Sequence, residues 1–182
     1  MKFRKAKIED ASSIVEIHNE NARKNMDAGQ QSFLLNETSV EKLTKRLNSS
    51  ATQYFVATIE EKVVGFLQIS IGIPDDELEE YEQLIFYNES DKELVDNKHV
   101  HLLTLAVYKD YQNKGIAKFI YESLFENFKG YSFSGFVVEY PLENRSSIRF
   151  HEYFGFEILG RFISDFHFSM KDYRSIFFFR RK

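Results

Sequence analysis

An apolar segment that leads through a polar turn into a helical pattern is the feature that most constrains the fold of this chain. Residues 100–107 (VHLLTLAV) are almost wholly apolar, as expected for a strand that is covered on both faces. From Gly115 onward the apolar residues recur with the period of a helix, which is predicted to run for about three turns. A strand followed directly by a helix indicates a sheet with helices packed on its faces.

Similar segments continue this alternation along the chain. Strands are predicted near 2–8, 53–59, 63–71, 133–140, 156–168 and 173–180, and helices after Asp10, after a Thr38–Glu41 capping box and over 145–154. Residues 60–62 are expected to form a hairpin turn, followed by alternate residues on one face from Val63 to Ile71. The last two strands are expected to join around Met170 to Asp172. The pattern predicts an α/β or α+β fold, with residues 1–182 in a single domain.

The composition excludes several kinds of site. The 182 residues contain no cysteine, so disulfides, thiolate ligands and thiol nucleophiles are absent. His99 and His101 could share a strand face, but no third ligand follows in register, so no metal is predicted. The pI near 5.8 argues against general nucleic-acid binding. No signal peptide and no run of ~18 apolar residues is found, so we expect a cytoplasmic protein without a membrane partner.

Acidic residues gather in one part of the chain, which we call the acidic segment (residues 74–98). It holds ten Asp and Glu residues against two lysines, a net charge of −8, whereas the whole chain carries −4. The rest of the chain is therefore basic. A charge run of this kind is usually a solvated loop or helix. The alternative is that its field attracts a cationic substrate.

The turn between the apolar strand and the next helix has the composition of an anion site. Residues 112–118 (QNKGIAK) place a glycine, a small alanine and two lysines at the start of the helix. The first N–H groups of a helix lack internal partners and carry the positive end of its dipole, which suits a phosphate or pyrophosphate. Gly115 would let the backbone approach such a ligand closely.

Two segments resemble motifs of the GNAT superfamily of N-acetyltransferases. Gln112-x-x-Gly115-x-Ala117, preceded by Leu-Ala-Val at 105–107, is similar to the family's pyrophosphate loop. Residues 144–156 (NRSSIRFHEYFGF) resemble the family's Asn-x-x-Ala-x-x-Leu-Tyr-Glu-Lys-x-Gly-Phe segment and follow at the expected distance. The resemblance implies a mixed, mostly antiparallel central sheet flanked by about four helices, in which the strands at 100–107 and 133–140 splay apart.

The resemblance also implies how acetyl-CoA would bind as a cosubstrate. The main chain of Leu105 and Val107 would hold the pantetheine arm, an N–H near Leu105 would polarise the thioester carbonyl, and Asn144 would bond the arm from the other side. The amides of residues 112–117 would hold the pyrophosphate. The cofactor-binding residues expected are Leu105, Ala106, Val107, Gln112, Asn113, Lys114, Gly115, Ile116, Ala117, Lys118 and Asn144.

The catalytic residues are less sharply defined. Where the family commonly has a tyrosine that protonates the leaving thiolate, this chain has His151, and a histidine can donate the same proton. Alternatively, His151 packs under the cofactor helix, and Tyr153, Tyr140 or solvent supplies the proton. Candidates for the general base that deprotonates the amine are Glu139 and His101, followed by Glu61. Each of these also fits an ordinary polar position.

These features predict an acetyl-CoA-dependent N-acetyltransferase in which a primary amine attacks the thioester directly. The expected acceptor is a small cationic amine or a peptide amine, with the acidic segment as a lid. One alternative is a non-catalytic module of the same fold that binds CoA or a protein, and another is an aromatic-rich ligand-binding sheet without CoA. Phe177 to Phe179 in a terminal edge strand would need cover, so a homodimer through that edge is expected.

Overall fold

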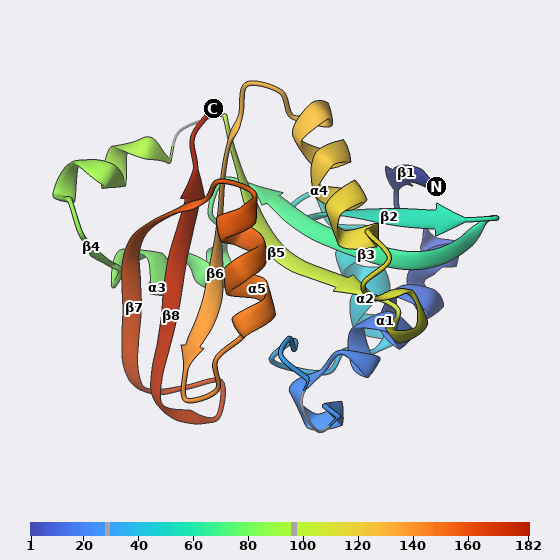
Figure 1. The fold of residues 1–182 in the computed structure, drawn as a ribbon, viewed down its shortest axis with the longest axis horizontal. Helices are drawn as coiled ribbons and strands as arrows, with labels where there is room; N and C mark the ends of the chain where they lie inside the picture. Colours follow the sequence, from blue (N-terminus) through green and yellow to red (C-terminus); the bar gives the residue numbers. More distant parts are fainter. Residues whose placement is uncertain (28–29, 96–97) are drawn as a thin grey trace. The chain divides into compact units, whose positions relative to one another are not determined.

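The computed structural model describes residues 1–27, 30–95 and 98–182. Its strands follow the hydrogen-bonded order β1-β2-β3-β5-β6-β8-β7-β4 in a mostly antiparallel sheet, in which β5 and β6 are parallel. The predicted mixed sheet with flanking helices is therefore confirmed (Figure 1). The chain divides into two compact units, which we call the first unit (Met1–Ser70 and Leu103–Lys129) and the second unit (Ile71–Leu102 and Gly130–Lys182). That the chain is one domain stays a prediction.

The first unit holds three helices and the N-terminal strands. Its strands are β1 (Lys2–Lys5), β2 (Gln53–Ile59), nearly all of β3 (Lys62–Ile71) and the C-terminal part of β5 (His99–Val107). Its helices are α1 (Ala11–Glu20), α2 (Val40–Leu47) and α4 (Ile116–Asn127), and short 3₁₀ turns span Ile8–Asp10, Arg23–Asn25 and Lys109–Tyr111. Within the described residues, no helix combines the length and the apolar character needed to cross a bilayer.

Both faces of β3 are covered by helices. Every residue from Val63 to Ser70 is buried. Phe66 belongs to a core cluster with Ile14 of α1 and Leu43 of α2. A Cβ added to the neighbouring Gly65 would lie 3.1 Å from Ile120 Cδ1 of α4, so the missing side chain makes room for that helix. The residues between those predicted to share one face are therefore buried as well, because consecutive residues of β3 face different helices.

Two local predictions in the first unit are wrong. The β2–β3 turn consists of two residues, Glu60 and Glu61 at φ 48° and 65°, and Lys62 already pairs with Ile59. A turn with both residues at positive φ matches the twist of a hairpin better than the three-residue turn expected. Helix α2 is capped by Ser39, whose Oγ accepts a bond of 3.3 Å from the backbone N–H of Lys42, and not by the predicted capping box.

The second unit is built on the C-terminal strands. These are β6 (Ser132–Tyr140), β7 (Glu157–His167), β8 (Met170–Arg180) and the short β4 (Ile85–Phe86), together with the start of β5. Helices α3 (Leu78–Glu82) and α5 (Arg145–Tyr153) and the 3₁₀ turns Asp75–Glu77 and Glu89–Leu94 complete the unit. The parallel pairing of β5 with β6 joins His99 to Ser132 and His101 to Ser134. The acidic segment supplies α3, β4 and both 3₁₀ turns, except that Asp96 lies outside the described residues.

The last strand of the chain is an interior strand. β8 pairs with β6 on one side and with β7 on the other, and Phe177 to Phe179 are at most 2% exposed. The expected aromatic edge, and with it the basis for a dimer through that edge, is therefore wrong. The predicted joint at Met170 to Asp172 is wrong as well, because Phe168 and Ser169 form the turn and both predicted residues lie in β8.

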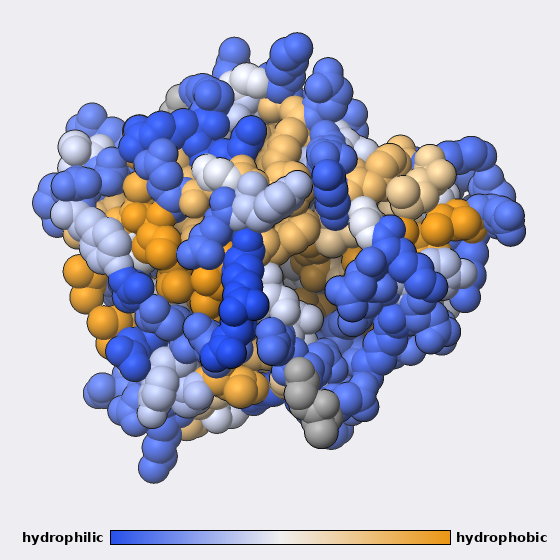
Figure 2. Space-filling view, in the orientation of Figure 1, coloured by the Kyte–Doolittle hydropathy of each residue, from blue (hydrophilic) through white to orange (hydrophobic). Residues whose placement is uncertain are grey.

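Three exposed apolar side chains of the second unit lie on β4 and β7, not on β8. Ile85 of β4 is 58% exposed, and Ile163 and Phe166 of β7 are 51% and 62% exposed. Figure 2 shows orange surface gathered where Figure 1 draws β4, β7 and β8.

Candidate active site

The turn after β5 has the geometry of an anion site. The chain leaves β5 at Val107, passes through a 3₁₀ turn and enters α4 at Ile116. Asn113 and Gly115 adopt left-handed conformations, at φ 59° and 79°, and Gly115 is the N-cap of α4. The first hydrogen bond of the helix runs from the N–H of Phe119 to the carbonyl of Gly115, at 3.0 Å. The amides of Ile116 and Ala117 precede this bond at the helix start, where they can face an anion.

Several lysines lie around the start of α4. No acidic residue lies in the first turn of α4. The Nζ of Lys114 lies 5.3 Å from the ring centroid of Tyr111, and the Nζ of Lys62 lies 5.2 Å from the same ring. Lys62 comes from β3 and was not among the predicted site residues, because in the sequence it is only part of a hairpin connection. Lys118, one turn into the helix, is exposed and lies 3.8 Å from Glu122.

The end of β5 presents its backbone to two different sides. The N–H of Tyr108 donates to the carbonyl of Val64 on β3 at 2.9 Å. The carbonyl of Ala106 also points to β3, since it lies 3.2 Å from the position of a Cβ on Gly65. Backbone groups alternate along an extended strand, so those of Leu105 and Val107 point to the opposite edge. This is the orientation that main-chain binding of a ligand arm requires.

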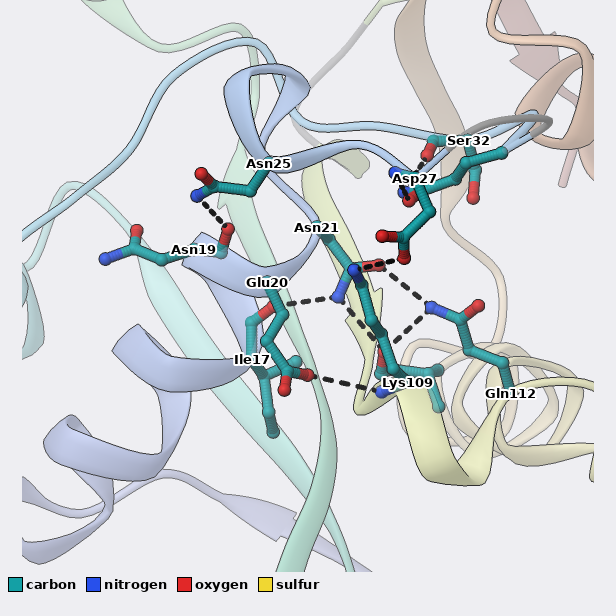
Figure 3. Close-up of polar contacts among 11 residues, drawn as sticks. Ile17, Asn19, Glu20, Asn21, Asn25, Asp27, Ser32, Lys109 and Gln112 are labelled. Carbon is teal, nitrogen blue, oxygen red and sulfur yellow. Dashed lines mark hydrogen bonds and ion pairs between the residues drawn. The ribbon is translucent and has the colours of Figure 1, made fainter.

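A buried side chain ties this strand end to α1 (Figure 3). Asn21 is 5% exposed and donates to the carbonyls of Ile17, at 2.8 Å, and Val107, at 3.1 Å. Its Oδ1 accepts from the Nε2 of Gln112 at 2.9 Å. Gln112 Nε2 also lies 3.3 Å from the carbonyl of Val107. Sequence reasoning missed Asn21, because an asparagine just after a helix is an ordinary helix end.

Three further contacts join α1 and the segment after it to the same turn. The Oε2 of Glu20 accepts from the backbone N–H of Lys109 at 3.3 Å, and Lys109 Nζ lies 2.6 Å from Asp27 (Figure 3). The hydroxyl of Tyr108 donates to Glu16 at 2.6 Å, and this bond raises the pKa of Tyr108 to about 12. The turn is therefore held from α1 at several points.

In the second unit, His151 is packed into the core. Its side chain stacks on Phe178, with ring centroids 5.1 Å apart, and its Nδ1–H donates to the carbonyl of Ser147 at 2.8 Å. Its Nε2 lies 3.8 Å from the position that a Cβ on Gly135 would take, so the glycine makes room for the ring. Burial lowers the pKa of His151 to about 4. The imidazole is therefore neutral at pH 7.

The other predicted residues near α5 are more accessible. Tyr153 is 68% exposed and Tyr140, at the end of β6, is 41% exposed. Asn144 occupies the N-cap position of α5, and its backbone N–H donates to the carbonyl of Val138 at 3.0 Å. Because Tyr140 and Tyr153 are exposed, both can exchange protons with solvent.

Two of the predicted bases are engaged in ion pairs. Glu139 accepts two hydrogen bonds from Arg161, at 2.9 and 3.0 Å. Glu61 lies 2.7 Å from Lys2 in the first unit, and this bond lowers the pKa of the Glu61 carboxyl. Both carboxylates are therefore already bound by a basic side chain.

The third predicted base, His101, belongs to a hydrogen-bonded chain within the second unit. Its Nε2 lies 2.7 Å from the Oε2 of Glu77, and its Nδ1 lies 2.6 Å from the hydroxyl of Ser134. The same hydroxyl lies 2.7 Å from His99 Nε2, and His99 Nδ1 lies 2.8 Å from Ser132. With Glu77 as the acceptor, His101 donates from Nε2, the Ser134 hydroxyl donates to His101 Nδ1, and His99 donates from Nε2 to Ser134.

Glu77 is the accessible end of this chain. Both histidines are fully buried, whereas the side chain of Glu77 is 23% exposed. Glu77 was not predicted, because it is one of ten acids in the acidic segment and nothing in the sequence sets it apart. Its neighbour Glu80 is buried and lies 2.9 Å from His167, and burial raises the pKa of the Glu80 carboxyl.

The acidic segment is therefore not a solvated run throughout, whereas its role as a lid stays a prediction. Six of its carboxylates are exposed: Asp75, Asp76, Glu79, Glu82, Glu89 and Glu93. Within the part of the chain that the structure describes, no three metal-binding side chains gather closely enough to hold a metal ion.

Comparison with known proteins identifies a family. The model described as Acetyltransferase (GNAT) family matches residues 14–156. No curated protein matches by sequence. Among solved structures, NAA60 from Arabidopsis thaliana in complex with a bisubstrate analogue aligns at a TM-score of 0.67 and 16% identity, covering 98% of this chain and 97% of that chain.

Two bacterial structures align similarly. The ribosomal-protein-S18-alanine N-acetyltransferase from Escherichia coli has a TM-score of 0.66 at 14% identity, covering 98% of this chain and 92% of that chain. YncA from Salmonella typhimurium, described as a putative acetyltransferase with its cofactor acetyl-CoA, has a TM-score of 0.64 at 14% identity and covers 99% and 92%. At these identities the structures support the fold alone.

Proposed function

Because the chain belongs to the acetyltransferase (GNAT) family, we propose that it transfers the acetyl group of acetyl-CoA to a primary amine by direct attack. The observation that carries this proposal is the turn at 112–118, where left-handed Asn113 and Gly115 lead into the start of α4. Backbone amides, the helix dipole and nearby lysines together suit a pyrophosphate.

The proposed arm-binding groups lie on β5. Acetyl-CoA would supply a thioester carbonyl at which the amine forms a C–N bond while the C–S bond breaks. We assign the N–H of Leu105 to the carbonyl oxygen, where a positioned donor stabilises the charge that develops. The carbonyl of Val107 already accepts from Asn21 and Gln112. The arm would therefore use the N–H of Val107 and the backbone of Leu105, and Asn144 keeps its proposed role on the arm.

For the general base, the geometry supports His101 acting with Glu77. An amine must lose a proton before or during attack, and Glu77 is the end of the hydrogen-bonded chain that solvent reaches. In this proposal the Glu77 carboxylate takes the proton directly or through water, and His101 orients the carboxylate by donating its Nε2–H. Glu139 ranks lower because Arg161 already binds both of its oxygens.

For the general acid, the geometry supports the alternative in which His151 is a packing residue. A group that is neutral at pH 7 carries no extra proton to give, and the only ring N–H of His151 is bound to Ser147. We therefore propose that Tyr153, Tyr140 or solvent protonates the thiolate, since both tyrosines reach the surface.

The proposed acceptor is a cationic amine, either small or at the end of a peptide. The exposed carboxylates of the acidic segment favour positive charge. A peptide amine also agrees with the Escherichia coli structure, which acts on an alanine of a ribosomal protein.

Paired glycine substitutions test the pyrophosphate site. Gly115 and Gly130 have nearly the same φ, 79° and 81°, and a Cβ at either would meet no atom within 4 Å. Gly115→Glu and Gly130→Glu therefore introduce the same backbone strain, roughly 1–2 kcal/mol, and the same charge. We expect Gly115→Glu to raise the Kd of acetyl-CoA by at least about tenfold, because its carboxylate competes with the pyrophosphate for the helix start.

The measurements are calorimetric titration with acetyl-CoA and thiol release with polyamines, aminoglycosides and peptide amines. Gly130→Glu is the control and should bind like the parent protein. Equal weakening in both variants, or no thiol release with any amine, would contradict the proposed function.

A further inference from the structure

We propose that Asn21 is a positioning residue for acetyl-CoA, which fixes the end of β5 and the start of the pyrophosphate turn relative to α1. This inference rests on the proposed function of residues 112–118. Asn21 belongs to neither of the two motifs and lies 86 residues before Val107 in the sequence. Its role follows only from its contacts.

The side chain of Asn21 forms hydrogen bonds with three groups that lie in different parts of the chain. One Nδ2 hydrogen goes to the carbonyl of Ile17 in α1, and the other goes to the carbonyl of Val107 in β5. The Oδ1 accepts from Gln112, the first residue of the turn. Both amide hydrogens are thus used within a site that is 5% exposed, where an unmade hydrogen bond is costly.

The contacts of Asn21 also determine what the turn can offer to a ligand. The Nε2 of Gln112 is turned toward Asn21 and the carbonyl of Val107, so this side chain faces the protein. With donors from both Asn21 and Gln112, the two lone pairs of the Val107 carbonyl are occupied. At Val107 the ligand is therefore left with the backbone N–H, which donates only to acceptor atoms such as carbonyl or phosphate oxygens.

Small errors in the placement of this turn would weaken binding. Several amides must meet one pyrophosphate at hydrogen-bond distance, and a site held by its surroundings loses affinity when that support is removed. The bond from Tyr108 to Glu16 of α1 is exposed, and in the pair of Lys109 with Asp27, which follows α1, the Asp27 side chain is 75% exposed. Exposed pairs contribute little rigidity, which leaves the buried Asn21 as the main support.

The test compares Asn21→Ala with Asn19→Ala. Asn19 lies two residues earlier and bonds the backbone of Thr38 through both its Nδ2, at 3.1 Å, and its Oδ1, at 2.9 Å. Its substitution therefore removes comparable hydrogen bonds, but these go to Thr38 and not to residues 107–112. We expect Asn21→Ala to raise the Kd and KM of acetyl-CoA about tenfold, with kcat at saturation changed less than about twofold.

Hydrogen exchange gives a second readout that needs no ligand. In Asn21→Ala the amides of residues 112–117 should exchange faster than in the parent protein, whereas Asn19→Ala should leave them unchanged. A cycle with Gln112→Ala completes the design. If Asn21 acts through Gln112, the Kd of acetyl-CoA in the double variant Asn21→Ala/Gln112→Ala should rise by less than the product of the two single-variant increases.

The outcomes separate this inference from the function on which it rests. A parent protein that fails to bind acetyl-CoA would refute the proposed function, and the exchange rates would still decide on Asn21. Unchanged exchange at 112–117 in Asn21→Ala, or equal effects of Asn19→Ala and Asn21→Ala, would overturn the positioning role.

Discussion

Single residues in this protein show that chemical type alone does not determine a role. His151 stands where the family commonly has a proton donor, yet it is buried against Phe178 and its pKa is lowered to about 4. Glu77 has no distinguishing neighbour in the sequence, yet it ends a chain of histidines and serines. In both cases burial and hydrogen bonding decide what the side chain can do.

The pH dependence of stability tests the role of His151. Its folded pKa lies below the unfolded value of 6.5, so the unfolded state binds more protons between about pH 6.5 and 4. The stability that the neutral ring contributes is complete above pH 6.5 and is lost as the pH falls through this window. From pH 7 to 4.5, His151→Phe should therefore lose roughly 2–3 kcal/mol less than the parent in its free energy of unfolding, measured with denaturant.

The turnover of the same variant separates packing from catalysis. If His151 only packs, His151→Phe keeps kcat within about threefold at pH 7, whereas removal of a general acid costs roughly 10²–10⁴-fold. Tyr153→Phe is the companion variant. A loss of kcat of that size in His151→Phe, with kcat unchanged in Tyr153→Phe, would identify His151 as the general acid.

At the scale of elements, the position of the turn at 112–118 depends on how α4 packs against β3. Helix α4 carries the N-terminal amides of the proposed pyrophosphate site, and it approaches β3 at Gly65. A Cβ on Gly65 would lie 3.1 Å from Ile120 Cδ1 and 3.2 Å from Ile116 Cγ2. The absence of a side chain on one strand thus sets the position of a helix start.

A two-residue cycle tests this packing. Gly65→Ala should lower the free energy of unfolding by about 1–3 kcal/mol, because α4 must shift to admit the methyl group. Ile120→Val removes the methyl at Cδ1 and alone should cost about 0.5–1.5 kcal/mol. The free energy of unfolding of the double variant, measured with denaturant, should fall by less than the sum of the two single decreases. Simple additivity would mean that the helix does not rest on this contact.

At the scale of the whole molecule, charge is distributed unevenly along the chain. The acidic segment carries −8 within a chain of −4. Glu77, Glu80 and Asp91 turn inward or lie partly covered, so the outward field comes from the six exposed carboxylates. That field favours cationic acceptors at a range of about 10 Å in 0.1 M salt.

Charge neutralisation tests whether this field selects the acceptor. Asp75→Asn/Asp76→Asn should raise the KM of a polyamine several-fold at low salt, with a smaller effect at high salt. The KM of acetyl-CoA should not change. Glu9→Gln/Glu126→Gln removes the same charge from exposed positions outside the segment and is the control. Equal effects of the two pairs, or no preference for cations in the parent, would exclude selection by the acidic segment.

The sequence alone determined the features that depend on local order. The period change at Gly115 located the turn and α4, and the apolar runs located β2 and the other main strands, because periodicity and turn chemistry act between near neighbours. The left-handed Gly115 follows from the same local logic.

Only the tertiary structure determined which of these segments contact one another. The sequence could not place β8 between β6 and β7, bring Asn21 to Gln112, or select Glu77 from ten acids, because each depends on contacts between residues far apart in the chain. Nor could it choose between the two roles left open for His151, whose pKa is lowered by burial. Local propensities fix the elements, whereas burial and long-range hydrogen bonds assign the chemistry of each side chain.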